Sequence, residues 1–216
     1  MGSVALGRLR LVEEDRMCGI VGYVGRKSAG EILLNGLKRL EYRGYDSAGM
    51  VTLDGGEFQL RKASGRVQRL NDQVTVDPAL GCIGIAHTRW ATHGRPTIDN
   101  AHPHVDDAGR VALVHNGIIE NYSMLREALE KEGVTFITET DTEVLVQLIG
   151  KVYSSDSLTF AEAIQLALQD VVGTYGIAAI CSDDPEIVIG ARLGSPLVLG
   201  VGDNEFFLAS DASPII

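Results

Sequence analysis

The chain lacks the features that mark several large classes of protein. Its three cysteines, Cys18, Cys82 and Cys181, are too few and too scattered for a disulfide framework, and they fit a reducing compartment. No apolar run approaches the roughly 20 residues that a membrane-spanning helix needs. The formal net charge of −10 disfavours binding to nucleic acid or to an anionic membrane. We therefore expect a cytoplasmic protein with neither nucleic acid nor membrane as a partner.

Several catalytic signatures are also missing. The sequence has no dinucleotide fingerprint, no phosphate-binding loop and no Gly-x-Ser-x-Gly nucleophile elbow. His102 and His104, with His87 or His93 nearby, raise the question of a metal site. However, His102 and His104 flank a proline, and neither His-Glu-x-x-His nor Cys-x-x-Cys occurs. We expect no metal and no cofactor.

What is present is a pattern of alternating strands and helices in a chain of 216 residues, long enough for one well-packed domain. Periodicity and turn residues predict strands over 18–25, 82–87 and 110–115, a hairpin over 50–62, four short strands over 174–210, a helix after a capping box at 28–31, and helices over 118–131, 141–153 and 159–171. Residues 88–109 form a long polar loop. Hairpins rather than strict βαβ units favour layered sheets covered by helices.

Cys18 is the first candidate for chemistry because it directly follows Met17. If translation starts at Met17 and that methionine is removed, Cys18 carries a free α-amino group beside its thiol. The amine titrates near pH 8 and the thiol near 8.5, so one residue supplies both a base and a nucleophile. The ordinary alternative is a small apolar residue that opens a buried strand.

A second candidate is the segment His87–Gly94, at the end of a predicted strand. Arg89 offers a planar fork for a carboxylate, and Thr92 and His93 can add hydrogen bonds beside it. The alternative is that Arg89 pairs with a surface acid while Trp90 packs on the core.

A third candidate lies in Val114–Asn121, where a strand is predicted to break into a helix. The Asn116 amide and the Gly117 backbone N–H can both point at a developing oxyanion, although asparagine and glycine are also ordinary turn residues. Asp141 has two readings as well: it can cap the helix over 141–153, or its carboxylate can hold the ammonium of a ligand.

Taken together, these segments resemble one family. The matching segments are Cys18–Gly22, Glu41–Gly49 (EYRGYDSAG), His87–Gly94 (HTRWATHG), Asn100–His104 (NAHPH), His115–Asn121 (HNGIIEN), Glu139–Glu143 and Gly194–Leu197. They resemble the glutaminase domain of the glutamine–fructose-6-phosphate aminotransferase (glucosamine-6-phosphate synthase) family, within the class II glutamine amidotransferases. The resemblance covers 18–216. The second, third and fourth segments are more specific to this sugar-phosphate family than to its phosphoribosyl, glutamate-synthase or asparagine-synthetase relatives.

The resemblance implies an α+β fold of the N-terminal-nucleophile hydrolase type, a four-layer αββα sandwich of two antiparallel sheets flanked by helices. It also implies a role for each matching residue. Cys18 corresponds to the nucleophile, Asn116 and Gly117 to the oxyanion hole, Arg89 with Thr92, His93 and Gly94 to the carboxylate site, Asp141 to the ammonium site, Trp90 to the loop that closes over glutamine, and Arg43 and His87 to supporting positions.

The activity implied is hydrolysis of glutamine through a thioester on Cys18. In the full-length enzyme, ammonia would pass to fructose 6-phosphate bound by sugar-isomerase domains of the same chain, which 18–216 does not contain, and that enzyme would be a homo-oligomer. The domain alone would act only as a glutaminase. Two alternatives stay open: a non-catalytic glutamine-binding module, and a class II amidotransferase with a different acceptor.

Residues 1–17 are expected to be a leader outside the fold. Charged residues such as Arg8, Arg10 and Glu13 interrupt the apolar region of any signal peptide. Met17 as the functional start, a cleaved propeptide and a cloning tag are three explanations. We favour Met17 because Cys18 follows it directly and a methionine before a small residue is readily removed.

Overall fold

The computed structural model describes residues 18–43, 46–90, 95–155 and 157–215, with Arg43 and Ser155 described by backbone alone. Its strands form two sheets in which every neighbouring pair runs antiparallel. The first sheet has the order β3-β2-β4-β1-β10-β9, made of β1 (Gly19–Val24), β2 (Ser47–Asp54), β3 (Glu57–Ser64), β4 (Ile83–Arg89), β9 (Val198–Val201) and β10 (Phe206–Ala209). The second has the order β5-β6-β7-β8, made of β5 (His104–Val105), β6 (Val111–Ile119), β7 (Gly173–Cys181) and β8 (Asp184–Leu193).

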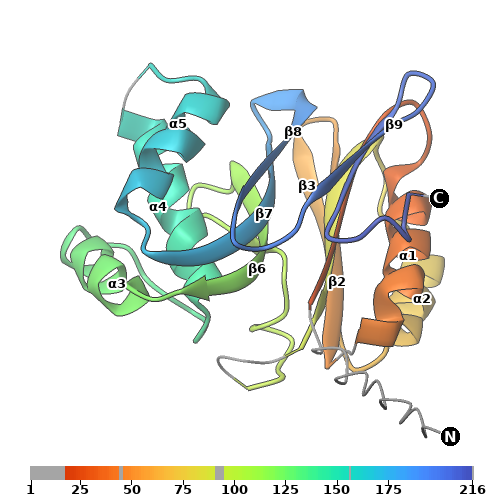
Figure 1. Ribbon diagram of the computed structural model, residues 1–216, viewed down its shortest axis with the longest axis horizontal. Helices are drawn as coiled ribbons and strands as arrows, with labels where there is room; N and C mark the ends of the chain where they lie inside the picture. The colour runs from red at the N-terminus through yellow and green to blue at the C-terminus, as the bar shows by residue number, and fades with distance from the viewer. Residues whose placement is uncertain (1–17, 44–45, 91–94, 156, 216) are drawn as a thin grey trace, which may run out of the picture.

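Helices cover the outer face of each sheet (Figure 1). On the six-stranded sheet lie α1 (Ala29–Leu40) and α2 (Val67–Val76). On the four-stranded sheet lie α3 (Tyr122–Lys131), α4 (Asp141–Ser155) and α5 (Phe160–Ala167). Short 3₁₀ turns follow α1 at Glu41–Arg43 and α5 at Leu168–Asp170. The predicted four-layer αββα sandwich is confirmed. Among the helices of the described residues, none has the length and hydropathy needed to cross a bilayer.

The core between the sheets explains how the strands are aligned. Ile83 and Ile85 of β4 face Ala112 and Val114 of β6 in one buried cluster, whereas the residues between them face the helices. Side chains alternate along a strand, so a slip by one residue would turn each buried set outward. Burial of one isoleucine is worth about 1.5–3 kcal/mol, which holds this register. The same alternation directs the next alternate positions of β4 and β6, near the strand ends, toward the space between the sheets.

The elements differ from expectation in several places. Strand β5 lies within 88–109, the segment predicted to be a long polar loop. Strand β6 continues through Ile119, so the helix predicted over 118–131 begins at Tyr122. Helix α2 was not predicted, because only Val67 and Leu70 of its residues are buried and its N-terminus has no side-chain cap. Ser28 precedes α1 but makes no capping hydrogen bond through its side chain. The helix predicted over 159–171 ends at Ala167 and continues as the 3₁₀ turn.

Candidate active site

One end of the sandwich gathers residues that are far apart in the sequence. Cys18 lies just before β1, Arg89 ends β4, Asn116 and Gly117 lie near the end of β6, and Asp141 begins α4. The pairing of Gly19 with Thr88 brings the start of β1 beside the end of β4. A cavity of about 30 Å³ lies among them, and it is lined by Cys18, Arg89, Trp90, His102, His115, Gly117, Thr140, Asp141 and Thr142.

The thiol of Cys18 is held by the backbone of Trp90. The Trp90 N–H donates to Cys18 Sγ at 3.2 Å, and the thiol is 3.5 Å from the Trp90 carbonyl oxygen. Burial raises the pKa of the Cys18 thiol, while the Trp90 N–H and the Arg89 charge act in the opposite direction. Because burial dominates, the thiol is mostly protonated at neutral pH and needs a base before it can attack a carbonyl carbon.

Asn116 connects the thiol-bearing residue to the core of the sandwich. Its Nδ2 donates to the Cys18 carbonyl oxygen at 3.0 Å, and its Oδ1 lies 2.9 Å from Nε2 of His87. Asn116 follows Ala112 and Val114 at every second position of β6, and His87 follows Ile83 and Ile85 in β4, so both point between the sheets. An amide fixed at this point can offer an N–H to a group that reacts at Cys18.

Gly117 adopts a backbone conformation that other residues rarely reach. Its φ is +130°, and a Cβ there would collide with the Thr174 carbonyl oxygen of β7. The strand nevertheless continues, with Gly117 opposite Tyr175. The strand therefore does not break at Asn116-Gly117 as predicted, because glycine lets it remain paired in an unusual conformation. Gly117 is exposed at the cavity, where its backbone can approach a ligand.

Asp141 lies at the N-terminus of α4, but Thr140 is the residue that caps it. The Thr140 hydroxyl accepts the backbone N–H of Glu143 at 3.2 Å, the usual bond of an N-cap. Oδ2 of Asp141 accepts the backbone N–H of Ile119 at 2.9 Å. Of the two readings of Asp141, the cap therefore falls to Thr140, and the Asp141 carboxylate is held at the cavity wall.

Arg89 brings a positive charge to the same cavity. Its side chain is 4% exposed, and Nη1 donates to the Arg95 carbonyl oxygen at 3.2 Å. With Asp141 it gives one cavity a buried guanidinium and a buried carboxylate. Such a pair suits a ligand that carries both charges, such as a free amino acid.

Most of the predicted site residues are brought together. Cys18, Arg89, Trp90, Gly117 and Asp141 line the cavity, and Asn116 and His87 extend from it. Thr92, His93 and Gly94 lie outside the described residues, as does the side chain of Arg43. His102 lines the cavity as well, although the sequence suggested it only as a metal ligand. His115, Thr140 and Thr142, which also line it, were not predicted as site residues. Their adjacency to Asn116 and Asp141 was the available signal.

Four buried histidines surround the site. The rings of His87 and His102 lie 4.2 Å apart between centroids, and those of His102 and His104 lie 5.0 Å apart. Burial lowers the pKa of His87 to about 3, and burial likewise lowers the pKa of His102, His104 and His115, so all four are neutral. Within the described parts of the chain, no group of three or more histidine, cysteine or acidic side chains is arranged to hold a metal ion.

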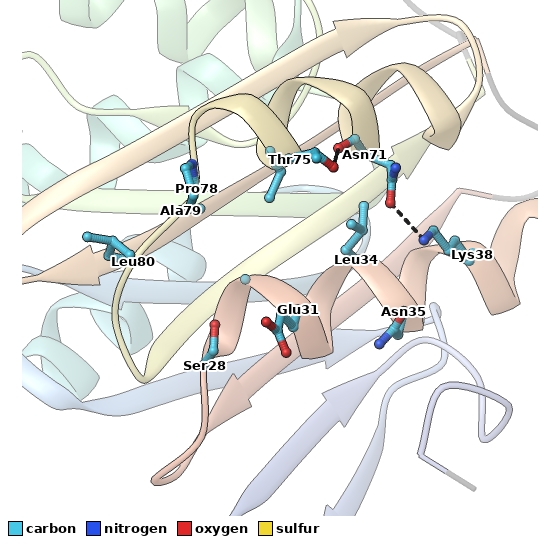
Figure 2. Close-up of a pocket in the computed structure, with 12 residues that line it drawn as sticks. Ser28, Glu31, Leu34, Asn35, Lys38, Asn71, Thr75, Pro78, Ala79 and Leu80 are labelled. Carbon is cyan, nitrogen blue, oxygen red and sulfur yellow. Dashed lines mark hydrogen bonds between the residues drawn. The ribbon is translucent and has the colours of Figure 1, made fainter.

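A larger cavity lies elsewhere, between α1 and α2. It measures about 510 Å³, and the hydrogen bond from Lys38 Nζ to Asn71 Oδ1, 2.8 Å long, joins the two helices beside it (Figure 2). Its walls include Glu31, Asn35 and Thr75, and none of the residues that line it is a cysteine or a histidine. Cys18, the Asn116 amide that bonds to it, and the buried charges of Arg89 and Asp141 lie at the smaller cavity and not at this one.

Comparison with known proteins supplies the family. A family model described as a glutamine amidotransferase domain matches residues 87–216, more than half of the chain. The chain belongs to this glutamine amidotransferase family. The amidotransferase is 53% identical over 204 residues to a glutamine–fructose-6-phosphate aminotransferase (isomerizing) of Chlorobaculum tepidum, covering 93% of this chain and 33% of the relative. The chain is also 53% identical over 201 residues to the protein of that name from Bacteroides thetaiotaomicron, with the same coverage. The chain therefore spans about a third of the length of the curated relatives it matches.

A solved structure supports the fold of the amidotransferase. The glutamine phosphoribosylpyrophosphate amidotransferase from B. subtilis superposes with a TM-score of 0.78 and 28% sequence identity. The match covers 91% of this chain and 42% of that chain. The αββα sandwich is thus the N-terminal-nucleophile fold of the glutamine amidotransferases.

Proposed function

We propose that this amidotransferase chain hydrolyses the side-chain amide of glutamine with the thiol of Cys18 as nucleophile. The observation that supports this most directly is the position of Cys18 in one cavity with the buried charges of Arg89 and Asp141. Glutamine carries an α-carboxylate and an α-ammonium, and these two charges match the guanidinium of Arg89 and the carboxylate of Asp141. Recognition of both ends would reject simple amides, because an unpaired buried charge is costly.

The chemistry begins with the proton of the Cys18 thiol. The α-amine of Cys18 takes this proton, and the thiolate attacks the side-chain amide carbon of glutamine. Nδ2 of Asn116 and the backbone N–H of Gly117 hold the oxygen of the tetrahedral intermediate. The C–N bond then breaks, and the ammonium of Cys18 returns the proton to the nitrogen that leaves as ammonia. Water hydrolyses the thioester, which releases glutamate and restores the thiol.

The remaining predicted roles complete the substrate site. Thr92, His93 and Gly94 join Arg89 around the α-carboxylate, and Trp90 lies on the segment that closes over glutamine. The contact between the Trp90 backbone and Cys18 Sγ supports a link between this segment and the nucleophile. Arg43 supports the segment beside Cys18.

The names of the curated relatives suggest the acceptor that we propose. We propose that 18–216 is the glutaminase domain of a longer chain whose sugar-isomerase domains bind fructose 6-phosphate and receive the ammonia, in a homo-oligomer. The relatives' printed name supports this acceptor, and their greater length supports further domains. The predicted leader, residues 1–17, lies outside the described residues. The three free cysteines support a reducing location such as the cytosol.

The test is to compare two forms of the protein, one expressed from Met17 so that Cys18 becomes N-terminal, and one that keeps residues 1–17. We expect the first to release glutamate from glutamine and the second to be at least about 100-fold slower, because a peptide nitrogen cannot act as the base. Cys18→Ala in the first form is the matched control: it should abolish turnover and retain glutamine binding by calorimetry. Equal turnover by both forms, or turnover by Cys18→Ala, would overturn the proposal.

A further inference from the structure

The side-chain amide of Asn116 is constrained from both sides. One of its polar atoms lies 3.0 Å from the Cys18 carbonyl oxygen, which can only accept a hydrogen bond, so that atom is Nδ2. Oδ1 therefore faces Nε2 of His87, 2.9 Å away. Because Oδ1 can only accept, Nε2 of His87 carries the proton. The two contacts together determine both the orientation of the amide and the tautomer of the imidazole.

The ring of His87 has little freedom to move. It is completely buried on β4, where Ile85 precedes it in the core between the sheets, and it packs against the ring of His102. Burial also keeps the imidazole neutral by lowering its pKa, so it carries a single N–H. That N–H is the one directed at Asn116. His87 is thus a rigid donor within the sandwich rather than a group that exchanges protons at neutral pH.

We propose that His87 is a positioning residue for glutamine hydrolysis: its Nε2–H holds the Asn116 amide so that Nδ2 faces Cys18 and the developing oxyanion. The inference rests on the proposed function. The nitrogen Nδ2 has two N–H groups, and while one bonds to the Cys18 carbonyl, the second is left to serve the oxyanion. Rotation of the amide by half a turn would place Oδ1 against the Cys18 carbonyl oxygen and the developing oxyanion. Oxygen would then repel oxygen at both positions.

The chain offers matched variants for a test. His87→Gln keeps an N–H near the position of Nε2, whereas His87→Phe keeps a flat ring and removes the donor. Thr52→Val is the control, because it removes a buried hydrogen-bonding side chain from the same sheet, and the Thr52 hydroxyl donates to the Leu80 carbonyl oxygen instead of a residue of the site. Loss of an oxyanion donor lowers kcat about 100- to 1,000-fold, so loss of its support should lower kcat less, by about 10- to 100-fold.

The experiment is a kinetic double-mutant cycle on the form that begins at Cys18. We expect His87→Phe to lower kcat by about 10-fold or more with KM changed less than about twofold, His87→Gln to restore most of the rate, and Thr52→Val to leave kcat within about twofold. In an Asn116→Ala background, His87→Phe should have no further effect, because the group that it positions is gone. Independent effects of the two substitutions, or an unchanged kcat for His87→Phe, would overturn the inference.

A second readout does not depend on turnover. The ¹⁵N chemical shifts of His87 in the wild-type protein should identify the Nε2–H tautomer at neutral pH, and those of the Asn116→Ala variant should show that this preference is weakened. A wild-type protein that does not hydrolyse glutamine would overturn the proposed function. The tautomer would still decide whether His87 holds Asn116, and an Nδ1–H tautomer would contradict the inference.

Discussion

The four buried histidines predict a steep loss of stability in mild acid. A histidine has a pKa near 6.5 in the unfolded chain, whereas burial lowers the pKa of His87 to about 3 and those of His102 and His104 well below the usual value. Below pH 6.5 the unfolded chain therefore binds protons that the folded protein does not. Protons then favour unfolding, and the free energy of unfolding falls as the pH is lowered.

The size of the effect follows from the number of histidines. Between pH 7 and pH 5.5, one such histidine lowers the free energy of unfolding by about 1.2 kcal/mol, so the three together lower it by about 4 kcal/mol. His115, whose pKa is lowered by burial against the opposing charge of Asp141, adds to this. A loss of about 4 kcal/mol is a large share of the 5–15 kcal/mol typical of a domain. Carboxylates with a lowered pKa, such as Glu139 and Glu205, change the free energy of unfolding only below about pH 4.5.

The assay is urea unfolding at pH 7.0 and 5.5, followed by circular dichroism, with equal m-values as the check on two-state behaviour. His93, the one histidine outside the described residues, is replaced by glutamine throughout so that it does not contribute. In that background, His87→Gln should reduce the difference between the two pH values by about 1.2 kcal/mol. A total difference below about 1.2 kcal/mol, the share of one histidine, would refute the reasoning.

Two further predictions concern the site. Arg89 lowers and Asp46 raises the pKa of the Cys18 thiol. At pH 7.5, Arg89→Met should therefore slow the alkylation of Cys18 by iodoacetamide, and Asp46→Asn should accelerate it, with the exposed Cys82 as the internal reference. A change of rate in the same direction in both variants would refute this prediction. Gly117→Ala should lower the free energy of unfolding by at least about 3 kcal/mol, since φ is +130° and the new Cβ meets the Thr174 carbonyl. Gly109→Ala, at φ +68° with open space around it, should cost only about 1–2 kcal/mol, and equal losses would contradict the account.

The sequence predicts the strands and helices that build the layers better than it predicts where each of these elements ends. Alternating apolar residues such as Ile83 and Ile85 mark a strand because the pattern is local and is repeated. The end of β6 was misjudged because Asn116 and Gly117 have turn preferences, while the pairing that extends the strand comes from β7, more than 50 residues away. Helix α2 has few buried residues, so its periodicity is weak.

The candidate site was also predicted only in part. Cys18, Arg89, Asn116 and Asp141 were predicted from residue type and from the family resemblance, and the structure brings them together. The contact between His87 and Asn116 could not be read from the chain, because the two lie 29 residues apart on different sheets and meet only when the sheets pack. The orientation of a side-chain amide depends on such neighbours, and no local pattern encodes it.

The central claim is that Cys18 is the nucleophile that attacks glutamine. The most direct measurement is peptide mapping by mass spectrometry after the form that begins at Cys18 has reacted with a glutamine analogue in which a diazoketone replaces the amide. The account predicts a single adduct on Cys18, suppressed by excess glutamine and absent in Arg89→Met at the same reagent concentration. An adduct on Cys82 instead, or labelling of Cys18 that glutamine does not suppress, would contradict it.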